Sequence, residues 1–223
     1  MSTDNAERIV SLAADLFAQH GFHGVTTRQI AAAAQLNIAT VHHHVGTKGE
    51  LYARVLDRMQ REENELAARF LEALDGAIAQ GAAALRTLLI STADAIVATM
   101  DQNPSRARLY MRRWLEPADT LSEAQSIHSL RLYNNLCDAF ERAQAAGCIH
   151  PRCEPGFLLR TLDWIIYGYF IGGPVTRTNW RNDPHDPEHL EKFRRYLRDY
   201  LCTMLGLGRS EEHTSELQSH HDL

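Results

Sequence analysis

Hydrophobic residues recur along this chain at the three- and four-residue spacing of amphipathic helices, and no segment of any length alternates as a strand would. The first such pattern begins at Ile9 and stops at Gly21. Glycine and proline then separate further helical patterns, which lie at about residues 80–101, 104–116, 120–147, 155–173 and 186–206. Together with the elements described next, the pattern predicts an all-α protein of about nine helices.

Two short helices are expected between the first helix and the long one. Thr26 and Gln29 have the spacing of a capping box, which opens a helix through residue 34. Asn37 is a suitable N-cap for a helix over 38–44. Two short helices joined by a tight turn, after a longer supporting helix, are typical of a helix-turn-helix.

A long helix is predicted next. Thr47 and Glu50 form a second capping box, and the apolar stripe that follows extends to about residue 74. Gly76 and Gly81 are expected to break the helix there.

The N-terminal residues resemble the DNA-binding signature of the TetR family. The matching positions are Ile9, Ala13, Ala14, Leu16, Phe17, Gly21, Thr26, Thr27, Ile30, Ala31, Ala34, Thr40, His44, Lys48 and Leu51. The resemblance covers one fifth of the chain, and the remainder agrees with the family only in helix number and length. It implies a helix-turn-helix domain over 1–47, followed by a helical ligand-binding and dimerisation domain over 48–208.

Readout of a major groove needs side chains that reach base edges and anchors that hold phosphates on either side. The start of the first short helix offers backbone N–H groups and hydroxyls to a phosphate. On the second short helix, Leu36, Val41 and Val45 face the core by their spacing, which leaves the other positions for DNA. We expect DNA contacts from Thr26, Thr27, Arg28, Ile38, Ala39, Thr40, His42, His43, His44 and Lys48. The resemblance implies phosphate contacts for His44 and Lys48, and His43 is the expected base-edge donor.

Three residues depart from the family pattern. Gln35 replaces the usual turn glycine, so a positive φ at this position costs on the order of 1 kcal/mol. His42 stands where the family prefers tyrosine, and Val45 stands where it prefers phenylalanine. Each departure leaves the exact DNA contacts open. The three consecutive histidines are not expected to bind a metal ion, because neighbouring helical side chains point about 100° apart.

The second domain is expected to bind a small molecule and to form a homodimer. Candidate residues of an apolar pocket are Met100, Tyr110, Met111, Trp114, His128, Tyr133, Trp164 and Tyr167, although each of them taken singly favours a plain core role. The arginine pair at 112–113 would meet an acidic group or be solvated. The expected dimer interface combines two glycines one turn apart with a C-terminal stripe, whose alternative role is intramolecular core; its residues are Gly168, Gly172, Leu190, Phe193, Leu197, Leu201 and Met204.

Composition narrows the function classes. The chain has 223 residues, with 23 Lys and Arg against 28 Asp and Glu, and a net charge of −5. The overall charge is therefore not basic and does not by itself indicate a nucleic-acid partner. The four cysteines lack the spacing of a zinc site and indicate reduced thiols in a cytoplasmic protein. A polar N-terminus predicts no signal peptide, and the apolar stretch 157–173 is too short and charged for a membrane span. No catalytic motif is present, so neither enzymatic activity nor a cofactor is expected.

The last fifteen residues, RSEEHTSELQSHHDL, resemble the in-frame translation of a common short-read sequencing adapter. We therefore expect the natural gene to depart from this sequence near Gly208, and residues 209–223 to be a non-native tail. Without them the net charge is −2. Resequencing the locus tests this expectation.

The sequence thus predicts a ligand-responsive repressor that binds a near-palindromic DNA operator as a dimer and is released by a small molecule. An activator or a nucleoid-associated protein would share these residues. A small-molecule-binding protein with a weakened DNA head is a further alternative, because of the three departures.

Overall fold

The computed structural model describes residues 2–115 and 123–208, and every regular element within them is an α-helix. The helices are α1 (Ser2–Gly24), α2 (Thr27–Ala34), α3 (Ile38–Val45), α4 (Lys48–Gln80), α5 (Ala82–Gln102), α6 (Ser105–Leu115), α7 (Glu123–Ala145), α8 (Pro155–Gly172) and α9 (Pro187–Leu205). The predicted all-α class, with nine helices in these residues, is confirmed. The predicted tail at 209–223 lies outside the described residues.

The short helices begin where the predicted caps lie. The backbone N–H of Gln29 donates to Thr26 Oγ1 at 3.3 Å, and its side chain accepts from the Thr26 backbone N–H at 2.8 Å. Asn37 Oδ1 accepts from the backbone N–H of Thr40 at 2.7 Å. These bonds satisfy N–H groups that the first turn of a helix leaves without partners. The helix-turn-helix is therefore fixed by local contacts within a few residues.

The long helix α4 extends past its predicted end. Thr47 and Glu50 cap its start as expected, but the helix continues through Gly76 and stops only at Gly81, where φ is 98°. A glycine inside a helix costs only about 1 kcal/mol, and the buried stripe continues on either side of Gly76 with Leu74 and Ala77. Packing on this stripe therefore outweighs the intrinsic preference of one glycine.

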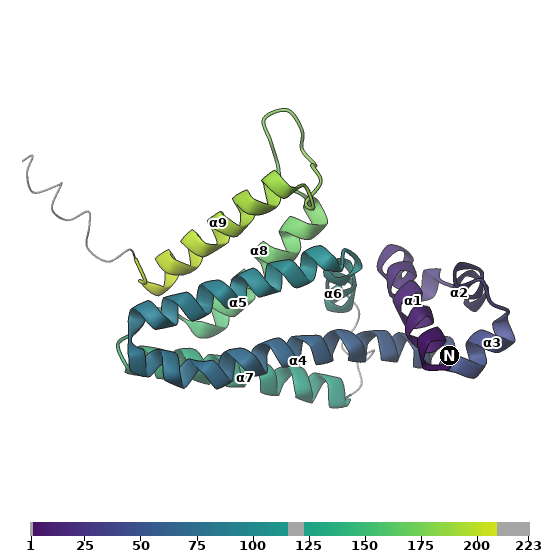
Figure 1. The fold of residues 1–223 in the computed structure, drawn as a ribbon, viewed down its shortest axis with the longest axis horizontal. Coiled ribbons are helices and arrows are strands. Elements are labelled where there is room, and N and C mark those ends of the chain that lie inside the picture. The colour runs from purple at the N-terminus through teal and green to yellow at the C-terminus, as the bar shows by residue number, and fades with distance from the viewer. Residues whose placement is uncertain (1, 116–122, 209–223) are drawn as a thin grey trace, which may run out of the picture.

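The helices form two units joined by α4 (Figure 1). One end of the molecule holds α1, α2 and α3, while α4 runs from this unit into the larger bundle, where α5 and α7 pack along it. α8 packs against α6 and α7, and α9 against α5. Within the described residues, α5 has the length and hydropathy of a membrane helix, which is weak evidence because core helices pass the same test.

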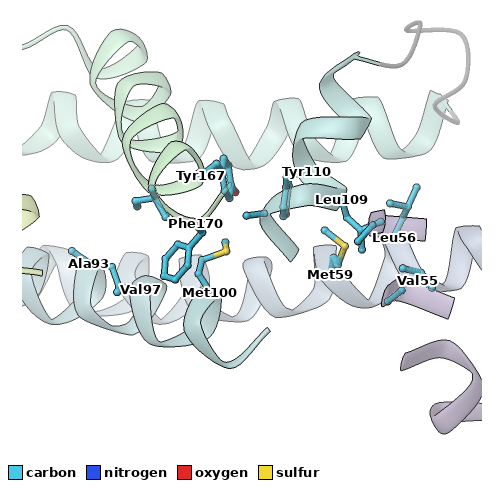
Figure 2. Close-up of a cluster of buried hydrophobic side chains, with 14 of the residues drawn as sticks. Val55, Leu56, Met59, Ala93, Val97, Met100, Leu109, Tyr110, Tyr167 and Phe170 are labelled. Carbon is cyan, nitrogen blue, oxygen red and sulfur yellow. The ribbon is translucent and has the colours of Figure 1, made fainter. Parts of the chain in front are cut away.

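Helix α6 lies at the junction of the two units and packs against both α1 and α8. Leu109 and Tyr110 are adjacent and buried on α6. Figure 2 shows Leu109 on the side of Met59, in α4, and Tyr110 on the side of Tyr167, in α8. The hydrophobic core therefore runs without a break from the N-terminal unit into the bundle.

Candidate DNA-binding surface and ligand cavity

The second short helix, α3, presents one face to the core and the other to the outside. Val41 and Val45 keep 1% and 0% of their accessible surface, as their spacing predicted. They pack with Ile30 and Ala34 of α2 in the same core. Because this inner face is fully used, the orientation of α3 is set by apolar packing, and its outer side chains are left free for a ligand.

Every predicted DNA-contacting residue lies at this outer surface. Exposed side chains are Thr26, Arg28, Ile38, Ala39, His42 and His43, and half-buried ones are Thr27, Thr40, His44 and Lys48. The Thr26 hydroxyl is already engaged with Gln29 Oε1 at 2.8 Å, which leaves its remaining acceptor capacity for other partners. These residues lie on α3, at the start of α2 and, for Lys48, at the start of α4, and together they make up the predicted DNA edge.

Lys48 has a structural role in addition to its predicted one. Its ammonium donates to the backbone carbonyls of Phe22 and Val25 at 3.1 Å each, and it lies 4.3 Å from the centre of the Phe22 ring. These contacts tie the start of α4 to the segment between α1 and α2. An ammonium has three N–H donors, so one remains for a phosphate.

Arg54 is a residue that the sequence did not single out. Its guanidinium donates to the backbone carbonyl of His44 at 3.2 Å, at the C-terminal end of α3. This carbonyl belongs to the last turn of the helix, where a cation is favourable. Arg54 is exposed and offers further donors beside the predicted DNA edge.

The expected strain at Gln35 is present. Its φ of 54° and ψ of 40° place it in the left-handed region, and it is the one non-glycine residue with positive φ in the described part of the chain. The Gln35 and Leu36 backbone N–H groups donate back to Ala32 and Ala31, which closes the end of α2. The turn therefore keeps the geometry that a glycine would adopt more readily.

The larger domain contains a cavity of about 850 Å³ that is partly open to solvent. Its walls come from α4, α5, α6, α7, α8 and α9. Of the predicted pocket residues, Met100, Tyr110, Trp114, Tyr133 and Tyr167 line this cavity. The volume is within the range of small-molecule sites, and most of the lining side chains are apolar.

Three predicted pocket residues do not take that role in the described structure. Met111 and Trp164 do not line the cavity, and Trp164 is 53% exposed with its ring edge against Trp114. Each follows directly a residue that does line the cavity, Tyr110 or Asp163, and successive helical side chains diverge by about 100°. The side chain of His128 lies outside the described residues.

The cavity also holds charged residues, of which the sequence analysis considered only Arg113. Glu63, Glu62, Arg106, Arg113, Arg160 and Asp163 all line it. A signal was available for the first, because Glu63 lies four residues after Met59 and seven before Phe70, on the buried stripe of α4. A charge on an apolar stripe indicates either a satisfied core group or a binding site.

Two of the arginines already have partners. Arg106 is ion-paired with Glu62 and donates to the backbone carbonyl of Met59 at 2.9 Å. Arg160 lies 3.4 Å from Asp163 and over the ring of Trp114, 5.0 Å from its centre. These two arginines are therefore already paired with groups of the protein itself.

Two half-buried carboxyl groups of the cavity have raised pKa values. Burial raises the pKa of Glu63, and the Tyr110 hydroxyl and nearby arginines offset this in part. Burial also raises the pKa of Asp163 to about 7, against the opposing field of Arg160. The negative charge of Glu63 also raises the pKa of Asp163, so the two carboxyl groups interact electrostatically across the cavity.

Three aromatic side chains stand beside these carboxyl groups. The Tyr110 and Tyr167 rings stack with centres 5.0 Å apart, and Trp114 meets Tyr167 edge-on at 5.4 Å. The Tyr110 hydroxyl is buried and lies beside Glu63, whose pKa it lowers by hydrogen bonding.

The predicted dimer stripe on α9 needs correction. Leu190, Phe193, Leu197 and Leu201 keep at most 9% of their accessible surface within the single chain. They are intramolecular core, the alternative that the sequence left open, because α9 packs on α5. Met204 is 48% exposed, and a Cβ added at Gly168 or Gly172 would meet nothing within 4 Å, so these three lie on an open face.

Helix α6 connects the cavity to the N-terminal unit by polar contacts. Arg112 donates from Nε to the carbonyl of Ala18 at 2.9 Å and from Nη2 to that of Gln19 at 2.7 Å. Ser105 donates to Asp15 Oδ1 at 2.5 Å. Arg112 is followed directly by Arg113, which lines the cavity. Arg112 therefore contacts α1 while Arg113 lines the cavity, and neither side chain is simply solvated.

A three-helix unit with an exposed second short helix, capped and packed in this way, is a helix-turn-helix DNA-binding domain. Residues 9–55 match the family described as "Bacterial regulatory proteins, tetR family". The match covers the helix-turn-helix unit, and the chain as a whole is similar to transcriptional regulators of this family.

Known relatives cover almost the whole chain. The HTH-type transcriptional regulator AcrR of Shigella flexneri is 22% identical over 207 residues, which are 92% of this chain and 89% of AcrR. A putative fatty acid metabolism regulator of Clostridium perfringens shares the fold at a TM-score of 0.66 and 15% identity, over 90% of this chain and 98% of that one. AibR, in complex with isovaleryl coenzyme A and operator DNA, has a TM-score of 0.58 and 16% identity, over 88% and 97%.

Proposed function

We propose that this chain is a ligand-responsive repressor that acts in the cytoplasm. In this proposal a dimer binds a near-palindromic operator and leaves it when a small molecule fills the cavity of the larger domain. The observation that carries the proposal is the direct connection, through α4 and α6, between the helix-turn-helix and the cavity of the larger domain.

The DNA-binding part rests on the outer face of α3. The N-terminal 61 residues hold six Lys and Arg against five Asp and Glu, so affinity depends on placed contacts and on the use of two copies rather than on net charge. In this arrangement the two copies of α3 enter successive major grooves about 34–36 Å apart.

The dimer is proposed to form through the open face of α8 and α9. Phe157, Trp164 and Gly168 are spaced by about one or two turns on α8, and Phe157 and Trp164 are 78% and 53% exposed. Tyr196 and Met204 of α9 are 56% and 48% exposed. A second copy of this face would cover these apolar groups, and Gly168 and Gly172 would let the helices approach closely.

The ligand response is proposed to pass through α6 as well as α4. Tyr110 lines the cavity and Leu109 packs toward α4, while Arg112 holds the carbonyls at the end of α1. A ligand that displaces Tyr110 would therefore move the support of the DNA-binding unit. Such coupling between sites is typically about 1–3 kcal/mol.

A gel shift and a footprint on the DNA that flanks the chain's own gene test the proposal. We expect protection of two half-sites about one helical turn apart, with an affinity that falls steeply as salt rises. The absence of any protected sequence there and in a genome-wide pull-down would overturn it. An operator upstream of a promoter, with activated transcription, would favour the activator alternative.

His43 provides the sharpest test of readout by α3. Replacing His43 with Ala should cost about 1–3 kcal/mol of operator affinity and relax preference at one base pair. His20, exposed on α1, supplies a matched His→Ala control that should leave binding unchanged. An unchanged sequence preference in the H43A variant would refute the base contact.

A further inference from the structure

We propose that operator binding by this chain takes up protons, because the imidazoles of His42, His43 and His44 become cations beside the DNA phosphates. The affinity for the operator then rises as the pH falls from 8 to 6. The inference rests on the proposed function, since it concerns the regulation of the same DNA-binding surface, and it adds the proton as a co-ligand of the operator. The position, the surroundings and the number of these imidazoles carry it.

The first observation is where the three histidines lie. They occupy the last turn of α3, on the side that the core leaves open, since Val41 and Val45 fill the inner face. His42 and His43 are exposed, and His44 is half-buried. In the proposed complex α3 enters a major groove, so side chains on its outer face come close to the phosphates that border the groove.

The second observation is that the free protein gives these imidazoles no anionic partner. None of the three forms a hydrogen bond or an ion pair in the described part of the chain. Glu50 interacts with His42 only weakly: the pKa of Glu50 is lowered first by its hydrogen bonds with Thr47, at 2.7 and 2.9 Å, and less by His42 and Arg54. DNA phosphates would supply the missing anions, and a nearby anion favours the cationic form of an imidazole.

Charged groups on the neighbouring helices do not replace the phosphates. α3 packs against α1 and α2, and α4 begins directly after it. Two acids of α1 have other partners, since Glu7 lies 3.9 Å from Arg58 and Asp15 accepts from Ser105. The titratable and charged side chains described on these elements are Glu7, Arg8, Asp15, His20 and His23 of α1, Arg28 of α2, and Lys48, Glu50, Tyr52 and Arg54 in the first turns of α4.

The third observation is the balance between permanent and proton-dependent charge. The permanent cations of the predicted DNA edge are Arg28 and Lys48, and Lys48 already donates to two backbone carbonyls. Arg54 lies beside this edge and donates to the His44 carbonyl. With neutral histidines, the six bases and five acids of the N-terminal 61 residues leave a net charge of +1. Three charged imidazoles would raise it to +4, so protonation changes the charge of this unit more than its permanent groups do.

The three imidazoles are not expected to charge together. The rings of His43 and His44 meet edge-on with centres 5.5 Å apart, so a proton on one makes a proton on the other less favourable. The side chain of His42 points about 100° away from that of His43 along the helix. We therefore expect an uptake of about one proton per subunit at pH 7 rather than three.

Calorimetry measures this uptake directly. The full chain is titrated at pH 7 with the duplex that the footprint identifies, in buffers of different ionisation enthalpy. The slope of the binding enthalpy against the buffer's ionisation enthalpy is the number of protons exchanged. We expect an uptake of about two protons per dimer. No exchange, or a release of protons, would overturn the proposal.

The dependence of affinity on salt shows whether the protons lie at the DNA. The operator Kd should fall about tenfold or more between pH 8 and pH 6. Each new cation at a phosphate adds about 0.9 to the slope of log K against log salt concentration, so the slope should be steeper by about 2 at pH 6. Equal slopes at the two pH values would place the titrating groups away from the phosphates and overturn the proposal.

Variants of two histidines locate the protons, while His43, the expected base contact, stays in place. His42→Gln and His44→Gln keep a polar side chain that takes up no proton, so the double variant should lose most of the uptake and of the change in slope. His42→Lys carries a permanent charge and should reduce the ratio of Kd between pH 8 and pH 6. Full wild-type uptake in the double variant would contradict the assignment.

Two controls separate these imidazoles from other titrating groups. His150→Gln changes an exposed imidazole in the loop between α7 and α8 and should keep the wild-type uptake. Burial raises the pKa of Asp163 in the cavity to about 7, so this group also titrates in the range of the experiment. Asp163→Asn should keep the uptake as well. Its loss in this variant would assign the protons to the cavity and overturn the proposal.

Failure of this inference is distinguishable from failure of the proposed function. A chain that binds its operator with one Kd at pH 6 and pH 8 keeps the proposed function and loses the proton linkage. A chain that protects no DNA at either pH loses both.

Discussion

The helix-turn-helix unit and the cavity domain are both built from amphipathic helices, but they place their polar residues differently. In the first, the interior is apolar and fully packed, with Ile9, Phe17, Ile30 and Val45 at 0% exposure, and polar groups stand at helix starts. In the second, charged residues such as Glu63 and Asp163 face an internal space. The N-terminal unit therefore has a fully packed apolar core. The cavity domain instead presents charged side chains with which a ligand can interact.

Truncation of large side chains should separate the two interiors most strongly. Phe17 packs against Phe22 and Tyr52, with ring centres 6.1 and 5.0 Å away, so Phe17→Ala should lower the free energy of unfolding by about 3–5 kcal/mol. Leu136 lines the existing cavity and is half-buried, so Leu136→Ala should cost only about 1–2 kcal/mol. Urea denaturation at one protein concentration measures both. Equal losses would mean that the cavity wall is as tightly packed as the N-terminal core.

The next prediction concerns the hydrogen bonds that join the cavity domain to the N-terminal unit. Arg112→Ala removes charge-assisted hydrogen bonds to Ala18 and Gln19, so it should reduce the coupling between cavity and operator by about 1–2 kcal/mol. The measurement is the operator Kd with and without a saturating concentration of an effector identified by its release of the operator. Arg108→Ala, at an exposed position of the same helix, is the control. An unchanged ratio in the Arg112 variant would leave α4 as the carrier of the signal.

The same contrast explains what the sequence could predict. The caps at Thr26, Asn37 and Thr47 depend on residues only three positions apart, so they can be predicted from the sequence alone. All three form as expected. The face of α9 could not be assigned, because an apolar stripe has the same spacing whether it covers α5 or a second subunit. Glu63 became a site residue only when α6 and α8 brought Tyr110 and Asp163 to it, which no local spacing encodes.

The cost of placing a carboxyl group in the cavity domain should be visible in the pH dependence of stability. Burial raises the pKa of Asp163 to about 7 from 3.8, so the folded chain holds a proton that the unfolded chain releases. The favourable contribution is complete below pH 4 and is lost as the pH rises through 7. Because the side chain stays 40% exposed, the loss relative to Asp163→Asn is about 1 kcal/mol.

Urea midpoints at pH 5 and pH 8 check this expectation. The wild-type chain should lose stability relative to the Asp163→Asn variant as the pH rises, and Asp199→Asn, on an exposed face of α9, should not reproduce the difference. Parallel curves for the chain and the Asp163 variant would show that the carboxyl group is better solvated than its surroundings indicate.

The smallest expected effect lies in the helix-turn-helix unit, at its one strained turn. Gln35 occupies the left-handed region at φ 54°, which costs a non-glycine residue about 1–2 kcal/mol. Glycine relieves this strain but loses about 0.5–1 kcal/mol through the greater freedom of the unfolded chain, so Gln35→Gly should raise stability by at most about 1 kcal/mol. Gln35→Ala keeps the strain and should give no gain. If both variants unfold at the wild-type urea midpoint, this turn carries no stored strain, and the N-terminal unit is as relaxed at its surface as it is in its core.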